Sequence, residues 1–97
     1  MFVITLTYVA PLEDIDALLP GHLEWLDRHY ATGTLLTSGR RVPRTGGVIL
    51  ARATDRAALD AVLAEDPFRR EGVATYDVVE FVPTRTAPGL EGLLPAD

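Results

Sequence analysis

The sequence of 97 residues contains no cysteine and no lysine. Without cysteine the chain has no disulfide, no thiolate nucleophile and no cysteine-based metal site. Without lysine it has no Schiff-base chemistry and no lysine-containing phosphate loop. The nine basic residues, all arginine, are outnumbered by 14 acidic residues, so the formal net charge is −5. This balance gives little electrostatic support for binding nucleic acid, and we expect none.

Long apolar runs are also missing, since no stretch approaches the roughly 18 residues that a membrane-spanning helix needs. The N-terminal residues MFVITLTY have neither the basic segment nor the small-residue cleavage site of a secretory signal. Hydrophobic residues make up 47% of the chain and charged residues 24%, which is typical of one soluble globular domain. We therefore expect a cytoplasmic protein that does not associate with membranes.

Nothing in the sequence supports a cofactor. The two histidines, His22 and His29, and the acids near them lack the i,i+4 spacing of a helical zinc site. Gly46 and Gly47 form a lone pair of glycines without the rest of a phosphate-binding loop. A metal site is therefore unsupported, and the expected cofactor is none.

The first half of the chain predicts a strand, a helix and a second strand. Residues 2–9 are rich in β-branched and aromatic side chains, which favour a strand. Over residues 12–32, three leucines and a tyrosine recur at spacings of three and four, the period of a helix. We expect a short first turn or helix and then the main helix, with Pro20 in the first turn of that helix, where its missing N–H costs nothing. A short strand is expected at residues 35–38.

The second half predicts a further strand, helix and strand before an irregular end. Three prolines and two glycines from residue 83 onwards indicate an irregular tail. The other expected elements are a loop at residues 39–46, a strand at 47–53, a helix capped by Thr54 or Asp55 and ended or kinked by Pro67, and a strand at 75–82.

The resulting order, β-α-β-β-α-β, is the split arrangement of a ferredoxin-like α+β fold. In this fold two helices cover one face of an antiparallel four-stranded sheet. We expect the domain to span residues 1–83 and the Pro- and Gly-containing tail to span residues 84–97.

Both faces of the predicted sheet carry apolar residues, although the helices can cover only one. In the first strand Val3 and Val9 lie on the face opposite Phe2 and Ile4. An uncovered apolar sheet face is rare on a monomer, so we expect a homodimer that buries this face against a second copy. The alternative is that the C-terminal tail covers it.

One ionisable residue interrupts the apolar stripe of each predicted helix. His22 falls between Leu19 and Leu26, and Asp66 continues the stripe of the second helix. Because both helices cover the same face of the sheet, the imidazole and the carboxylate can pair, as a buried charge requires. Such a pair suits a general acid/base. The alternatives are a structural pair, or a turn role for Asp66 before Pro67.

Weaker candidates lie near the end of the second predicted strand. Ser38 beside Gly39 could present its hydroxyl to a pocket, and Arg40, with Arg41 and Arg44, could attract an anionic substrate. A plain turn and a solvated hairpin are the alternatives. Trp25 either belongs to the core or lines a pocket or a dimer contact.

Four short motifs, in order and with preserved spacing over roughly residues 1–83, resemble the YciI-like (YCII-related domain) family. They are Pro20-Gly21-His22-Leu23 followed by Trp25-Leu26, Gly33-Thr34-Leu35-Leu36 followed by Ser38-Gly39, Asp66-Pro67-Phe68 with Gly72, and Val78-Val79-Glu80-Phe81.

The resemblance implies a ferredoxin-like fold of the dimeric α+β barrel type and a pocket with a His–Asp dyad. The dyad would be His22 and Asp66, with Ser38 nearby. We expect Gly39, Arg40, Trp25 and Phe68 to join Ser38 in binding a substrate. The family often has proline after Ser-Gly, whereas this chain has Arg40, which can bring a positive charge to the pocket mouth.

We therefore expect a small cofactor-independent enzyme of the lyase or isomerase type. His22 would act as general acid/base and Asp66 would orient it, on a small aromatic or anionic molecule. One alternative is a non-catalytic ligand-binding or accessory dimeric module in which the pair is structural. Another is a protein-interaction domain that acts through its sheet face or its tail.

Overall fold

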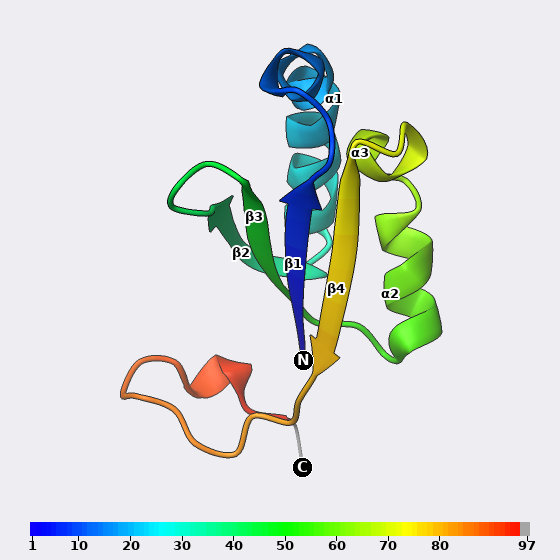
Figure 1. The fold of residues 1–97 in the computed structure, drawn as a ribbon. Coiled ribbons are helices and arrows are strands. Elements are labelled where there is room, and N and C mark those ends of the chain that lie inside the picture. Colours follow the sequence, from blue (N-terminus) through cyan, green and yellow to red (C-terminus); the bar gives the residue numbers. More distant parts are fainter. Residues whose placement is uncertain (96–97) are drawn as a thin grey trace.

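A four-stranded antiparallel sheet forms the centre of the computed structural model, which describes residues 1–95 (Figure 1). The strand order is β2-β3-β1-β4, so β1 lies inside the sheet and pairs with both β3 and β4. This order and the helices that accompany it confirm the predicted ferredoxin-like α+β fold. The strands are β1 (Phe2–Tyr8), β2 (Leu35–Arg40), β3 (Gly46–Ala51) and β4 (Ala74–Glu80).

Three helices complete the domain. The long helix α1 (Leu12–Ala31) follows β1, and α2 (Arg56–Leu63) and the short α3 (Pro67–Arg70) lie between β3 and β4. Their buried side chains pack against one face of the sheet, where alternate residues of β1 are fully buried. The core cluster thus joins Phe2, Ile4 and Leu6 of β1 to Ile15, Trp25, Leu26, Leu59, Leu63 and Phe68 of the helices.

The predicted break of the first helix at Pro20 is wrong. Helix α1 runs without interruption through Pro20, which lies inside the helix and not in its first turn. Proline removes one internal hydrogen bond of a helix. Burial of Ile15 before the proline and of Trp25 after it anchors both parts of α1 to the same core, which holds the helix together.

Several further boundaries differ from the predictions. Strand β1 ends one residue early and β3 two residues early, β4 (Ala74–Glu80) begins and ends before the predicted 75–82, and α2 already ends at Leu63. Residues 39 and 40 belong to β2 and not to a loop, because Gly39 pairs with Val48 and Arg40 with Gly47. Strand β3 also begins one residue early, at Gly46, where a side chain is impossible because a Cβ would lie 1.8 Å from the Leu6 carbonyl oxygen. The β2–β3 hairpin is therefore longer than its sequence suggests.

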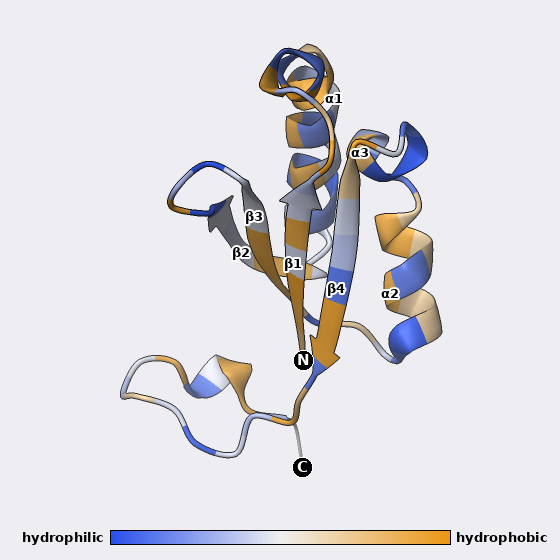
Figure 2. Ribbon diagram, viewed as in Figure 1, coloured by the Kyte–Doolittle hydropathy of each residue, from blue (hydrophilic) through white to orange (hydrophobic). Residues whose placement is uncertain are grey.

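The sheet face opposite the helices remains partly apolar and exposed. Val48 on β3 is 40% exposed and Val79 on β4 is 61% exposed. Figure 2 shows the apolar character of β1 and β3 and of one end of β4. The tail, as far as residue 95, leaves these two valines exposed. We keep the homodimer as a prediction.

After β4 the chain leaves the sheet (Figure 1). It forms one 3-10 turn, Glu91–Leu93, and the Arg52 guanidinium donates a hydrogen bond to the Gly92 carbonyl at 2.6 Å. Residues 96 and 97 of the predicted tail lie outside the described residues. Within residues 1–95, no helix is both long enough and apolar enough to cross a membrane.

Candidate active site

The structure brings His22 and Asp66 into hydrogen-bond distance. The His22 Nδ1 atom lies 2.8 Å from Asp66 Oδ1, although the two residues are 44 positions apart in the chain. Asp66 is fully buried and His22 nearly so. Helix α1 supplies the histidine from its buried stripe, and the turn between α2 and α3 supplies the carboxylate.

Asp66 combines two roles that the sequence had left as alternatives. It pairs with His22, and it also caps α3, because its Oδ1 accepts a hydrogen bond from the Phe68 backbone N–H at 3.1 Å. Pro67 occupies the first position of α3, where no N–H is needed. The same residue therefore fixes the start of a helix and the orientation of an imidazole.

A third donor, which sequence analysis missed, completes the environment of Asp66. The Tyr76 hydroxyl donates to Asp66 Oδ2 at 2.5 Å. Burial, reinforced by the charge of Asp66, raises the pKa of Tyr76 well above its usual value, so the phenol keeps the proton that it donates. The available signal was its place in β4, since Tyr76 pairs with Leu6 and so shares the helix-facing side of the sheet.

Two aromatic rings hold the imidazole of His22. The Phe68 ring stacks on it at a centroid distance of 4.1 Å and an interplanar angle of 9°. Trp25 packs against it at 5.6 Å, and the Trp25 indole N–H donates to the Val62 carbonyl at 2.9 Å. Trp25, predicted as a substrate-binding residue, is fully buried, and this hydrogen bond holds its ring in the core next to His22.

A cavity of about 610 Å³ opens beside His22 and lies between α1 and the β2–β3 hairpin. We call it the His22 cavity. Of the predicted substrate-binding residues, Ser38, Gly39, Arg40 and Phe68 line it, as His22 does. Most of the remaining lining residues are apolar or glycine, namely Leu6, Leu19, Leu23, Leu26, Gly46, Gly47, Val48 and Ile49. The other three are Tyr8, Asp16 and Arg44.

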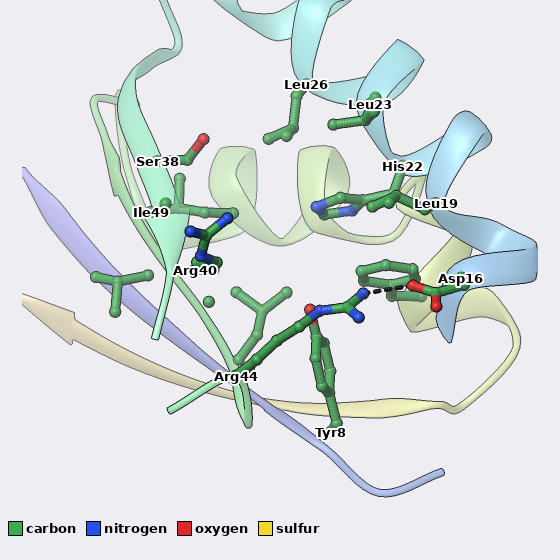
Figure 3. A pocket seen from close by; sticks show the side chains of 16 residues that line it. Tyr8, Asp16, Leu19, His22, Leu23, Leu26, Ser38, Arg40, Arg44 and Ile49 are labelled. Carbon is green, nitrogen blue, oxygen red and sulfur yellow. Dashed lines mark hydrogen bonds and ion pairs between the residues drawn. The ribbon is translucent and has the colours of Figure 1, made fainter. Parts of the chain in front are cut away.

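Figure 3 shows how the polar groups are distributed around the His22 cavity. Ser38 and Arg40 lie on the side of β2, and His22 projects from α1 on the opposite side. The Ser38 hydroxyl is hydrogen-bonded to the Tyr30 hydroxyl. Among the described residues, the Nε2 atom of His22 has no hydrogen-bond partner, so it is the ring nitrogen left for a ligand.

The second histidine lies elsewhere. His29 Nε2 is 3.2 Å from Glu65 Oε1, and His29 does not line the His22 cavity. Within residues 1–95, no three side chains of the metal-binding types come together as a metal site.

A family model and solved structures resemble this chain. The family model of the YCII-related domain matches residues 1–82. No curated protein sequence matches the chain significantly.

Solved structures with a similar fold include two that act on or oxidise small molecules according to their names. One is 5-chloro-2-hydroxyhydroquinone dehydrochlorinase from Burkholderia phenoliruptrix AC1100, in complex with 2,5-dihydroxybenzoquinone. It is 17% identical, with a TM-score of 0.70, and the match covers 84% of this chain and 93% of that one. The other is a cofactor-independent oxygenase from Streptomyces nogalater, 18% identical, with a TM-score of 0.50 and coverage of 90% and 94%. At these identities the likeness establishes the fold alone.

Proposed function

The chain belongs to the YCII-related domain family, and on that premise we propose that it is a small enzyme in which His22 and Asp66 act as a general acid/base pair. No cofactor takes part in the proposed reaction. The reaction class is elimination or isomerisation on a small, planar molecule. The observation that carries the proposal is the buried 2.8 Å contact between His22 and Asp66 at the wall of a cavity.

The hydrogen bonds of Asp66 define the proposed roles. Its Oδ1 faces His22 Nδ1, so this nitrogen carries the proton and Nε2 keeps its lone pair toward the His22 cavity. Nε2 accepts a proton from the substrate, and Asp66 stabilises the imidazolium that forms. The imidazolium then returns the proton to the leaving group or to another substrate atom. Tyr76 and the Phe68 N–H hold the carboxylate in place through both steps.

The volume and the lining of the His22 cavity favour a small substrate with apolar surface. Its volume of about 610 Å³ lies in the range of small-molecule sites, and six of its 16 lining residues are leucine, isoleucine or phenylalanine. One structural neighbour is named for the removal of hydrogen chloride from a hydroxyhydroquinone. That reaction is an elimination on a small planar ring. This supports elimination as the first reaction class to examine.

The test is release of chloride from 5-chloro-2-hydroxyhydroquinone by the wild-type chain and two histidine variants. His22→Gln keeps an amide N–H that can meet Asp66 but has no base, so we expect a loss of at least about 100-fold. His29→Gln changes a histidine of the same helix outside the His22 cavity, and should retain wild-type turnover. Equal turnover by His22→Gln and wild type contradicts the acid/base role. Absence of release above the uncatalysed rate by wild type counts against elimination on this ring.

A second candidate function is supported by the structural contacts of Asp66. Because Asp66 also caps α3 and accepts from Tyr76, the pair could serve a non-catalytic ligand-binding module. That module would bind small molecules in the His22 cavity without turning them over. The affinities of a panel of small molecules for the wild type and for His22→Gln test this alternative. Equal affinities for the two proteins favour it.

We also propose that the chain works as a homodimer. The exposed apolar residues of the outer sheet face, Val48 and Val79, support burial against a second copy of the same face. His22 and the leucines of α1 line the His22 cavity from the helix-facing side of the sheet, away from Val79.

A further inference from the structure

Arg40 is an unpaired positive charge at the wall of the His22 cavity. In the register of the hairpin Arg40 pairs with Gly47 and Ser38 pairs with Ile49, so both residues point to the helix-facing side of the sheet. Arg40 lines the cavity and is exposed. Its guanidinium is therefore accessible to a molecule that enters beside His22.

The two other arginines of this hairpin are already engaged. Arg41 donates to the Thr7 hydroxyl at 3.0 Å, and Arg44 forms an ion pair with Asp16 at 2.5 Å. Among the described residues, Arg40 makes neither a hydrogen bond nor an ion pair with another side chain. Of these three guanidiniums, the one at Arg40 is thus available in full to a ligand.

The charge of the cavity has the opposite sign to that of the whole chain. Its permanently charged lining residues are Arg40, Arg44 and Asp16, which sum to +1, whereas the chain carries −5. Since Arg44 and Asp16 neutralise each other, the excess positive charge resides on Arg40. A positive group in a mainly apolar hollow attracts an anion that also has apolar surface.

We propose that the His22 cavity selects small planar organic acids, such as aromatic carboxylates, and that Arg40 is the residue that determines this specificity. The carboxylate meets the fork of Arg40 beside Ser38, and the ring lies against the leucines of α1. The far side of the ring then faces His22, which lies across the cavity in Figure 3. This inference rests on the proposed function, because it names the substrate class of the same site.

The test is binding of benzoate and of its neutral amide, benzamide, followed by NMR titration of the wild type and two variants. Arg40→Gln removes the cavity charge. Arg70→Gln removes one arginine from the exposed end of α3, outside the His22 cavity, and so controls for the change in net charge. We expect Arg40→Gln to weaken benzoate binding by about tenfold or more, to leave benzamide unchanged, and Arg70→Gln to behave as the wild type. Melting curves establish that both variants are folded.

The outcomes separate this inference from the proposed function. If wild type binds the two probes equally, or if Arg40→Gln changes neither, the assignment of Arg40 is overturned, even where turnover still depends on His22. If wild type binds neither probe, the assigned ligand class is overturned as well. If benzoate binding depends on Arg40 but turnover does not depend on His22, the acid/base role fails and the anion site stands.

Discussion

Asp66 accepts the Tyr76 hydroxyl on Oδ2, the oxygen opposite the one that meets His22. With the Phe68 N–H this gives the buried carboxylate three donors, from β4, α1 and the start of α3. The carboxylate is thereby fixed in both position and rotation. The imidazole that depends on it is fixed in turn, and its second nitrogen is directed away from Asp66.

Tyr76→Phe tests the contribution of this hydroxyl. The change leaves Asp66 Oδ2 buried without a donor, which should lower the free energy of unfolding by about 1–3 kcal/mol. Tyr30→Phe is the matched control, since it removes the exposed hydrogen bond to Ser38 and should cost about 1 kcal/mol or less. Denaturant unfolding of the two variants measures the difference. Equal decreases in the free energy of unfolding would show that the Tyr76–Asp66 hydrogen bond stabilises the fold no more than the exposed Tyr30–Ser38 one.

The raised pKa of Tyr76 should make the free energy of unfolding fall at alkaline pH. Its pKa is raised, first by burial and then by the Asp66 charge, so the folded chain keeps the proton above about pH 10, where an unfolded tyrosine loses it. The folded state then binds more protons than the unfolded state, and stability falls as pH rises, by up to about 1.4 kcal/mol per pH unit. Wild type should therefore lose stability more steeply above pH 10 than Tyr76→Phe. Parallel curves contradict the prediction.

Comparison of two helix caps separates the effect of the Asp66 charge from the effect of capping. Asp55 caps α2 by accepting from the Ala58 N–H, and Asp66 caps α3 by accepting from the Phe68 N–H. Asparagine caps helices about as well as aspartate, so Asp55→Asn should change stability by less than about 0.5 kcal/mol. Asp66→Asn turns one acceptor oxygen into a donor facing another donor, which should cost about 3 kcal/mol. Thermal and denaturant unfolding compare the two, and similar costs would argue that Asp66 is a cap alone.

The proposed dimer can be tested by a charge on the outer sheet face. Wild type should sediment at twice the chain mass of 10.5 kDa. Val79→Asp places a carboxylate on that face and should give monomers, whereas Val42→Asp, at a site 92% exposed in the hairpin, should remain dimeric. Sedimentation of the wild type as a monomer excludes the dimer.

The fold and the central contact of the site could be predicted from local patterns. Strand composition and helical periodicity gave the order of elements, and they placed His22 on a buried stripe. Asp66 lies just beyond α2, yet the turn before Pro67 keeps it directed at the same face. The His22–Asp66 contact could therefore be predicted from the helical periodicity of the two segments and from the sheet face that both helices cover.

The rest depends on interactions between distant segments. Tyr76 joins the site only through the register of β4 against β1, which periodicity does not set. The sequence does not show that Trp25 belongs to the core, because its hydrogen bond to the Val62 carbonyl has no sequence signature. Pro20 lies inside α1 because core packing on both sides of it outweighs a local helix-breaking tendency.

Protonation of the two His22 ring nitrogens decides whether a base faces the His22 cavity. Long-range ¹H–¹⁵N NMR on histidine-labelled protein, across the pH range in which the ring is neutral, reports which nitrogen carries the proton. We expect a protonated Nδ1, facing Asp66, and an unprotonated Nε2 whose resonance shifts when benzoate enters the His22 cavity. A protonated Nε2 with a bare Nδ1 would contradict this expectation, since the proton of the pair would then lie on Asp66 and no base would face the cavity.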